Sequence, residues 1–172
     1  MAMLLLVRHG ETDWNAEGRL QGYTDRPLND YGRRQSQALA ERLAGDEIAA
    51  IYASDLARAR ETAEIVGARL GLAVMLEPGL RERNWGSWEG LTGPERDRVE
   101  YVGEAPEEHA ARVIAAVQAI AERHQGGRVV VVTHGGSLRR IQAVAYGMAL
   151  PVVENCAVWA VAYEEGTFRP ID

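Results

Sequence analysis

Short apolar runs alternate along the chain with longer segments in which apolar residues recur every three or four positions. The runs are rich in aliphatic residues and predict five strands, at 3–8, 48–53, 72–76, 128–133 and 156–163. The recurring apolar positions predict helices over 36–43, 56–70, 113–121 and 138–146. Strands that alternate with helices indicate an α/β fold, a three-layer sandwich whose mostly parallel central sheet is covered by helices on both faces.

Length and composition predict a single domain over residues 1–172. The chain has 172 residues and is 47% hydrophobic, which suits one core and is short for two. The least regular stretch is 91–106, where glycine and proline recur, and we expect a short lid or insertion there. No apolar run reaches the roughly 18 residues of a membrane span, and no signal peptide precedes the first strand. We therefore expect a cytoplasmic protein.

The charge balance limits the partners that the chain can bind. With 25 acidic against 19 basic residues and a net charge of −6, we expect neither nucleic acid nor a membrane as a partner, and a homodimer is left open. All the bases are arginine, so no mechanism can use lysine. Cys156 is the only cysteine, which excludes an internal disulfide and a multi-thiolate zinc site. We expect no metal and no cofactor.

Cationic and titratable residues come at the ends of several predicted strands. Arg8 and His9 end the first strand, Arg58 falls in the first turn of the helix after the second, and His134 ends the strand at 128–133. Because the carboxyl ends of parallel strands meet at one edge of a sheet, these groups can converge on one crevice. Such a cluster of positive charge suits a phosphate dianion.

Three further residues are placed to join this crevice. Gly135 follows His134 and opens a helix, whose N–H groups and dipole favour an anion. Ser54 is placed to cap the helix that carries Arg58. Glu82 follows the third strand and can supply an acid at the same edge.

Ordered motifs run through most of the chain. They are Leu6-Val7-Arg8-His9-Gly10-Glu11-Thr12 with Trp14-Asn15, Gln21-Gly22, Pro27-Leu28, Ser54-Asp55-Leu56 with Arg58-Ala59, Leu80-Arg81-Glu82, Trp88-Glu89-Gly90 and Thr133-His134-Gly135-Gly136. In this order they resemble the histidine phosphatase superfamily, the group of phosphoglycerate-mutase-like enzymes. One such motif is weak evidence, whereas the ordered set is specific.

The resemblance implies a phosphohistidine mechanism. His9 would attack phosphorus as a neutral imidazole whose other ring nitrogen holds its proton on a backbone carbonyl. Arg8 and Arg58 would clamp the phosphoryl oxygens, with His134 as a further donor, and Glu82 would be the general acid and base. The residues that would bind the substrate phosphate are Arg8, Asn15, Gln21, Gly22, Arg58, His134 and Gly135.

Other interpretations of single residues stay open. Arg8 can instead be a structural ion-pair partner of Glu11. Trp85 and Trp88 can line a substrate wall or close the core, with equal weight. We read His109 and His124, on a helix or at its end, as solvated.

The segment after Glu82 favours the phosphatase branch over the mutases. Residues 83–90 are similar to phosphatases, only sixteen residues at 91–106 precede the next predicted helix, and nine follow Tyr163, so we expect neither a basic lid nor a closing tail. A site open to water favours hydrolysis. We predict a metal-independent phosphomonoesterase for a small phosphorylated metabolite. The alternatives are an α-ribazole phosphatase, which similar small bacterial enzymes suggest, a cofactor-dependent phosphoglycerate mutase, and a non-catalytic protein that binds a phosphorylated ligand.

Overall fold

The strands of the protein form one mixed sheet. The computed structural model describes residues 1–148, 150–151 and 153–171. Its strands are β1 (Ala2–Arg8), β2 (Ala50–Ala53), β3 (Val74–Leu76), β4 (Arg128–Thr133), β5 (Val158–Glu164) and β6 (Thr167–Pro170). Their order in the sheet is β3-β2-β4-β1-β5-β6. The four strands from β3 to β1 run parallel, whereas β5 pairs antiparallel with β1 and β6 antiparallel with β5.

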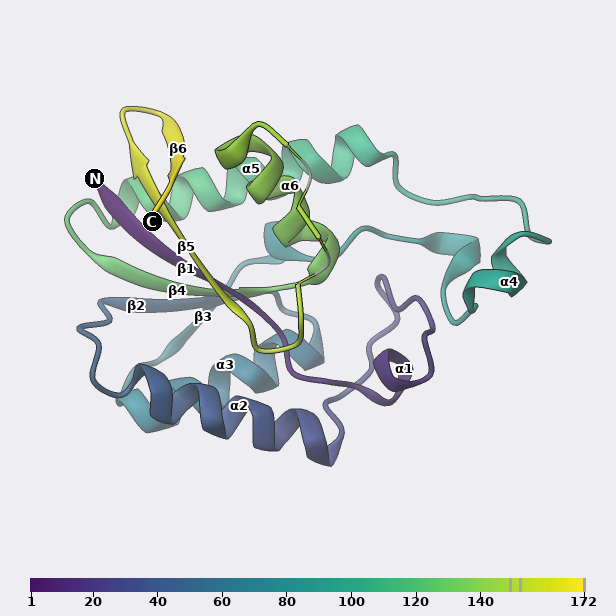
Figure 1. Cartoon of the computed structure of the whole chain (residues 1–172), viewed down its shortest axis with the longest axis horizontal. Helices are drawn as coiled ribbons and strands as arrows, with labels where there is room; N and C mark the ends of the chain where they lie inside the picture. Colours follow the sequence, from purple (N-terminus) through teal and green to yellow (C-terminus); the bar gives the residue numbers. More distant parts are fainter. Residues whose placement is uncertain (149, 152, 172) are drawn as a thin grey trace.

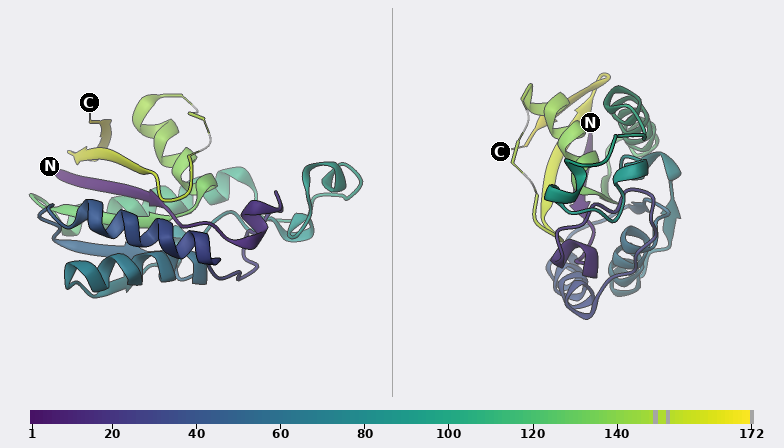
Figure 2. Two further views of the ribbon diagram at one scale, coloured as in Figure 1. Left: turned by 60° about the horizontal axis from the view of Figure 1, so that its bottom comes forward. Right: turned by 90° about the vertical axis from the view of Figure 1, so that its right-hand side faces the viewer.

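Helices cover both faces of this sheet. The α-helices are α1 (Asp13–Ala16), α2 (Asp30–Leu43), α3 (Ala57–Leu70), α4 (Gly93–Arg96), α5 (Pro106–Arg123) and α6 (Gly135–Tyr146), and the 3₁₀ turns are η1 (Pro78–Leu80) and η2 (Gly86–Trp88). In Figure 1, α2 and α3 lie below the sheet and α5 and α6 above it, and Figure 2 shows the same layers from the side. The predicted α/β sandwich with a mostly parallel sheet is confirmed. None of the helices in the described ranges has the length and apolar character to cross a membrane.

The alternation of side chains along β1 explains why both faces need a cover. Leu4 and Leu6 are buried in the cluster that includes α5 and α6, whereas Leu5 and Val7 are buried in the cluster that includes α2 and α3. In the neighbouring strand β4, residues 129–132 are four consecutive valines, all fully buried. A continuous apolar run is typical of a central parallel strand with a layer of helices on each side.

The end of the chain differs from the sequence prediction. After β5 the chain turns through Glu165 and Gly166, whose φ values of 50° and 79° form a two-residue hairpin, and β6 then pairs with β5. The dipeptide Glu165-Gly166 is the signal for this hairpin, and the prediction did not use it. The residues after Tyr163 therefore extend the sheet beside β5, at the end where β1 begins (Figure 1).

Candidate active site

A cavity of about 320 Å³ lies at the carboxyl ends of β1 and β4, on the side where α1 and α4 extend from the sheet in Figure 1. It is lined by residues from four separate parts of the chain: Arg8, His9, Asn15, Gly18, Arg19, Leu20, Gln21, Gly22, Arg58, Glu82, Trp85, Gly135, Gly136 and Arg139. All but one of the residues that the sequence predicted to bind or react with a phosphoryl group are in this set. The exception is His134, which is fully buried with its ring next to that of His9.

His9 presents a free ring nitrogen. Its Nδ1 lies 2.7 Å from the carbonyl oxygen of Gly10, and because a carbonyl can only accept, Nδ1 must carry the proton. Nε2 therefore keeps its lone pair. Burial and the charges of Arg58 and Arg8 lower the pKa of His9 well below its ordinary value, so the imidazole is neutral near pH 7. This is the protonation state that a nucleophilic histidine needs.

Arg8 and Arg58 are held by backbone carbonyls and not by carboxylates. Arg8 donates to the carbonyl of Val153 at 2.6 Å, and Arg58 donates to those of Gly22 at 2.7 Å and Thr24 at 3.2 Å. Burial lowers the pKa of Arg8, and lowers that of Arg58, which is 1% exposed, to about 10. Both keep a buried Nε without a partner among the described residues. Arg58 is buried and Arg8 partly buried, and guanidinium groups withdrawn from water without an ion-pair partner are costly unless an anion joins them.

Glu11 does not compensate Arg8. The Glu11 carboxylate accepts a hydrogen bond from Asn29 Nδ2 at 2.9 Å, and within the described ranges no ion pair joins it to Arg8. The interpretation of Arg8 as the ion-pair partner of Glu11 is therefore not supported, and Arg8 faces the cavity.

The loop that carries Gln21 and Gly22 is fixed by Glu89. The Glu89 carboxylate accepts hydrogen bonds from the backbone N–H groups of Tyr23 and Thr24, at 2.9 and 2.8 Å, and from that of Trp85 at 3.1 Å. Gly22 has a φ of +54°, and a Cβ there would lie 2.2 Å from Glu89 Oε1, so only glycine fits. Glu89 thereby aims the Gly22 carbonyl at Arg58. It was part of a predicted motif, but its structural role could not be read from the sequence.

Glu82 lines the cavity with both carboxylate oxygens held. Oε1 accepts the N–H of Arg83 at 2.8 Å, and Oε2 accepts the N–H of Gly136 at 2.9 Å. A Cβ at position 136 would lie 2.2 Å from Oε1, which explains the glycine. The N–H groups at the N-terminus of α6 were predicted to bind an anionic ligand. For Gly136 this prediction is wrong, because its N–H is already bound to the Glu82 carboxylate.

His134 lies behind His9, with 5.2 Å between the ring centroids. Its Nε2 is 2.8 Å from Ser54 Oγ, and its buried Nδ1 has no partner in the described part of the chain. Burial, followed by the charge of Arg58, lowers the pKa of His134 well below its ordinary value. The predicted cap role of Ser54 is wrong, because α3 begins at Ala57, whose N–H is bound by Asp25 at 2.7 Å.

The amide side chains of Asn15 and Gln21 complete the polar lining through Thr12. Thr12 donates its N–H to Asn15 Oδ1 at 3.1 Å and its hydroxyl to Gln21 Oε1 at 2.8 Å. Since the oxygen of each amide accepts inside the protein, the NH₂ group is the part that can donate to a ligand.

The interpretation of His109 as solvated is wrong. His109 is 1% exposed, and its Nε2 lies 3.0 Å from Ser137 Oγ and 3.7 Å from Glu82 Oε1. Ser137 donates to the carbonyl of Arg81, so Nε2 is the protonated nitrogen, and burial lowers the pKa of the ring. The signal was present in the sequence, because His109 is four positions before Val113 on the apolar stripe of α5. His124, read as solvated too, is half-buried and bonded to Tyr52 Oη at 3.1 Å.

Trp85 is a wall of the cavity, and Trp88 stacks on it outside the core. The two rings lie 6.3 Å apart with an interplanar angle of 14°, and Tyr101 packs edge-on against both. Trp88 Nε1 donates to the carbonyl of Val99, so this aromatic cluster ties residues 99–101 to η2. No residue from 91–106, the predicted lid, is among the residues that line the cavity.

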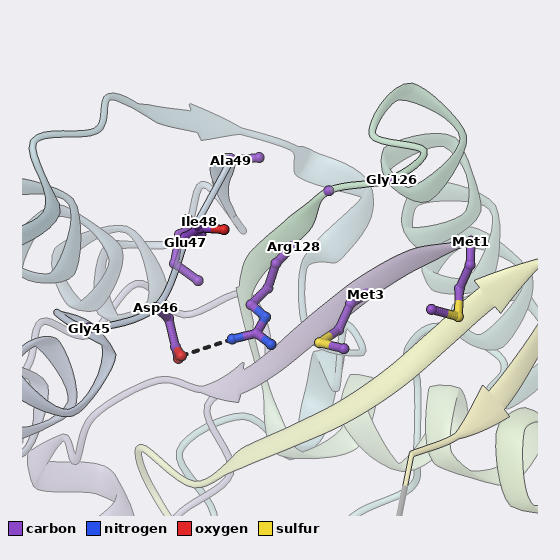
Figure 3. A pocket seen from close by; sticks show the side chains of 10 residues that line it. Met1, Met3, Gly45, Asp46, Glu47, Ile48, Ala49, Gly126 and Arg128 are labelled. Carbon is purple, nitrogen blue, oxygen red and sulfur yellow. Dashed lines mark hydrogen bonds and ion pairs between the residues drawn. The ribbon is translucent and has the colours of Figure 1, made fainter.

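A larger hollow of about 800 Å³ lies at the opposite edge of the sheet, where β1 and β4 begin (Figure 3). Its lining includes Met3, Arg128 and the loop at 45–49. The Arg128 guanidinium is paired with Asp46 at 2.8 Å, as drawn in Figure 3. This hollow has no histidine and no unpaired buried charge among its lining residues, so size alone does not mark the site.

Histidine, cysteine and carboxylate side chains do not gather into a metal-binding group. Within the described ranges, no three or more of them lie close enough to hold an ion.

Residues 4–171 match the histidine phosphatase superfamily, branch 1. The chain belongs to this superfamily. Two proteins of Arabidopsis thaliana are each 41% identical to it, the phosphoglycerate mutase-like protein 4 and a metal-independent phosphoserine phosphatase. These matches cover 81% and 80% of this chain, and 69% and 66% of the two relatives. The structure of Bacillus stearothermophilus YhfR superposes with a TM-score of 0.92 at 34% identity, covering 99% of this chain and 95% of that one. The family predicted from the ordered motifs is confirmed, and the chain is a phosphatase-type enzyme.

Proposed function

We propose that the chain is a metal-independent phosphomonoesterase that hydrolyses a small phosphorylated metabolite through a phosphohistidine on His9. The observation that carries this proposal is the hydrogen bond of 2.7 Å from His9 Nδ1 to the Gly10 carbonyl, which leaves the Nε2 lone pair free in a cavity that Arg8 and Arg58 also line. In the first step Nε2 attacks phosphorus and the P–O ester bond breaks. In the second step a water oxygen attacks phosphorus and the P–N bond breaks, which returns the lone pair to His9 Nε2 and releases inorganic phosphate.

Arg8 and Arg58 supply the positive charge that phosphoryl transfer requires. Both reach the cavity while backbone carbonyls fix their orientation, and planar guanidinium groups bind phosphoryl oxygens through paired hydrogen bonds. Fixed donors of this kind stabilise charge that develops in the transition state. The polar groups of Asn15, Gln21, Gly22 and Gly135 surround the same space and would orient the remaining oxygens.

Glu82 is the proposed general acid and base. Its carboxyl group would give a proton to the leaving alkoxide in the first step and take one from the attacking water in the second. Glu82 would thus end the cycle in the protonation state in which it began. The N–H groups of Arg83 and Gly136 fix the orientation of this group at the cavity wall. His134, whose ring centre lies 5.2 Å from that of His9 and whose Nδ1 has no partner among the described residues, is the proposed further donor to the phosphoryl group.

The substrate is a small metabolite because the cavity is small. Its volume of about 320 Å³ is at the low end of ligand pockets. O-Phosphoserine is a candidate because a relative with 41% identity is named as a phosphoserine phosphatase. α-Ribazole phosphate, a compound from the predicted alternative, is the second candidate. We expect the enzyme to work in the cytoplasm.

A mutase is the principal rival, because another relative with 41% identity is named as phosphoglycerate mutase-like. Mutases return the phosphoryl group to a bound phosphoglycerate, whereas the proposed enzyme gives it to water. A cavity that has no lining residue from the predicted lid at 91–106 favours water as the acceptor. A non-catalytic ligand-binding protein is the other rival, and it would bind phosphorylated compounds without turnover.

The experiment that tests the proposal measures phosphate release from a panel of phosphomonoesters that includes an aryl phosphate, phosphoserine, phosphoglycerates and α-ribazole phosphate. We expect hydrolysis that persists in EDTA and is inhibited by vanadate, which resembles the transferring phosphoryl group. Phosphoryl exchange between phosphoglycerates that exceeds phosphate release would identify a mutase. Loss of activity in EDTA that returns on addition of metal would contradict the cofactor-free mechanism.

A further inference from the structure

His109 is a buried histidine that the proposed reaction does not use. It lies on the apolar stripe of α5, four positions before Val113, and is 1% exposed. Its ring nitrogen Nδ1 is buried and has no partner in the described part of the chain. An apolar side chain at this position would avoid that unpaired polar atom, which is costly to bury. A histidine here therefore needs a compensating interaction through its other nitrogen, Nε2.

The surroundings of Nε2 lead to Glu82. Nε2 lies 3.0 Å from Ser137 Oγ and 3.7 Å from Glu82 Oε1. The Ser137 hydroxyl donates its own proton to the carbonyl of Arg81 at 3.0 Å, so Oγ accepts from His109 and the imidazole proton is on Nε2. Ser137, fully buried on α6, thus fixes the ring with Nε2–H beside the Glu82 carboxylate.

The two carboxylate oxygens of Glu82 differ in their neighbours. Oε1 accepts the N–H of Arg83 and has His109 Nε2 as a second neighbour. Among the described residues, the one donor to Oε2 is the N–H of Gly136. Each carboxylate oxygen has two lone pairs. Oε1 therefore has an N–H group near it for each lone pair, whereas Oε2 keeps one lone pair that can carry a proton.

The backbone around Glu82 is held independently of His109. Arg112 donates to the carbonyls of Gly79, Arg81 and Glu82, at 2.9, 3.0 and 3.2 Å. Loss of the imidazole would therefore release the side chain of Glu82 and leave the loop that carries it in place.

We infer that His109 is a positioning residue for the general acid: its Nε2–H holds Oε1 of Glu82, so that Oε2 carries the proton given to the leaving alkoxide. When that proton leaves, negative charge develops on the carboxylate, and a fixed N–H in a buried environment stabilises it. Contacts of catalytic groups often shorten when substrate binds, and the distance of 3.7 Å would shorten in this way. The inference rests on the proposed function, because it assumes that Glu82 is the acid.

The test compares two substrates that differ in their need for an acid. A nitrophenyl phosphate loses its leaving group without a proton, whereas an alkyl phosphate needs a proton on the leaving oxygen as its P–O bond breaks. kcat/KM, which reports the steps up to the phosphoenzyme, is measured for the nitrophenyl ester and for the alkyl phosphate that the wild type hydrolyses fastest.

Three variants are compared with the wild type. His109→Phe keeps a planar ring and lacks the N–H, whereas His109→Gln places an amide N–H near the position of Nε2. Val113→Ala is the matched control for a loosened helix, because Val113 is fully buried one turn along the same face of α5. A thermal melt of each variant shows whether it is folded.

The expected loss is selective for the alkyl phosphate. In His109→Phe, kcat/KM should fall at least about tenfold for the alkyl phosphate and stay within about threefold for the nitrophenyl ester, since a misplaced acid loses part of its effect. His109→Gln should retain the alkyl activity within about threefold, because it restores the N–H. Val113→Ala should change both substrates alike. Equal losses in His109→Phe, an unchanged alkyl activity, or a loss in His109→Gln as large as in His109→Phe would overturn the inference.

Glu82→Gln separates this inference from the proposed function. It should lose alkyl activity selectively, and adding His109→Phe to it should cause no further selective loss, because His109 acts through Glu82. A selective loss in Glu82→Gln without one in His109→Phe would reject the inference and retain Glu82 as the acid. No selective loss in Glu82→Gln would overturn the assigned acid and the inference together.

The tautomer of His109 tests the same arrangement in the unaltered protein, without turnover and without a variant that must fold. Long-range ¹H–¹⁵N NMR spectra of protein labelled in histidine identify the nitrogen that carries the proton. We expect Nε2 to carry it at pH 7.5. A proton on Nδ1 in its place would remove the donor to Glu82 and overturn the inference.

Discussion

The two edges of the sheet both have a hollow and an arginine, yet they differ in how the charge is compensated. At the edge where β1 and β4 begin, Arg128 is paired with Asp46, and both side chains are about one third exposed. At the edge where the same strands end, Arg58 is 1% exposed and contacts backbone carbonyls alone. The hollow at the first edge is the larger, at about 800 Å³ against 320 Å³.

A buried arginine without a direct ion pair, and not cavity size, distinguishes the functional edge. An ion pair at the surface is complete without a ligand and contributes little to stability. A buried guanidinium without a carboxylate is costly for the free protein and becomes favourable only when an anion arrives. The two edges therefore predict different responses to the same kinds of substitution.

The largest effect is expected for His9→Ala. Removing the nucleophile should lower kcat/KM for an aryl phosphate by at least about 10⁴-fold, while the fold persists. His124→Asn, at the other end of the molecule, is the control and should stay within about twofold of the wild type. Steady-state phosphate release and a thermal melt of each protein provide the data. Turnover by His9→Ala near the wild-type rate would show that another residue is phosphorylated.

Arg58→Met and Arg128→Met compare the two edges directly. Loss of a preorganised donor to the phosphoryl group should cost about 10²–10³-fold in kcat/KM for Arg58→Met. The same substitution of Arg128 should leave kcat/KM unchanged. If the two variants lost activity equally, the edges would not differ in function.

Binding of inorganic phosphate compares the two edges of the sheet without any turnover. At a concentration 100 times its Kd, phosphate should raise the free energy of unfolding of the wild type by about 2.7 kcal/mol. Arg128→Met should show the same gain, and Arg58→Met should show almost none. Urea unfolding with and without phosphate measures this increase in the free energy of unfolding. An increase of the same size in Arg58→Met would show that phosphate binds elsewhere.

The free energy of unfolding should depend on pH, because three histidines at or near the candidate site are buried. Burial keeps the pKa values of His9, His134 and His109 low in the folded protein, whereas in the unfolded chain they return to about 6.5. Between these values the unfolded state binds more protons, so stability falls as the pH drops below about 6.5. Each histidine lowers the free energy of unfolding by up to about 1.4 kcal/mol for each pH unit below that point.

Urea unfolding between pH 7.5 and pH 5 measures this slope. The paired carboxyl group of Asp55 does not interfere, because Arg81 lowers its pKa further below this range. A free energy of unfolding that stays constant over the range would mean that the three histidines are protonated when folded.

The smallest effect belongs to the ion pair at the opposite edge. Asp46→Asn should lower the free energy of unfolding by less than about 1 kcal/mol, since both partners are accessible to solvent. A double-mutant cycle with Arg128→Met gives the coupling energy. A coupling above about 2 kcal/mol would show that this pair is structural after all.

The sequence predicted the layers of the fold because the core repeats a simple pattern. The valine run of β4 and the stripe of α3 each reflect burial directly, so the pattern in the sequence and the structure agree. The hairpin to β6 was missed because its strand has only four residues and a single buried apolar side chain, Phe168, so that only the turn at Glu165 and Gly166 indicates it.

The sequence also predicted which residues meet at the site, because parallel strands bring their carboxyl ends to one edge. It could not predict side-chain partners. Ser54 bonds to His134 instead of capping a helix, the Gly136 N–H is taken by Glu82, and His109 is buried beside Ser137. These contacts depend on distances between separate elements, which periodicity does not contain.

The phosphoenzyme itself is the most direct test of the central claim that His9 accepts the phosphoryl group. Wild-type and Glu82→Gln proteins are mixed with an aryl phosphate, quenched in alkali within one turnover, and mapped by mass spectrometry. The account predicts an acid-labile phosphoryl group on the peptide that contains His9, at higher occupancy in Glu82→Gln because that variant lacks the base for hydrolysis. A quenched protein that turns over substrate but has no phosphoryl group on His9 would contradict it.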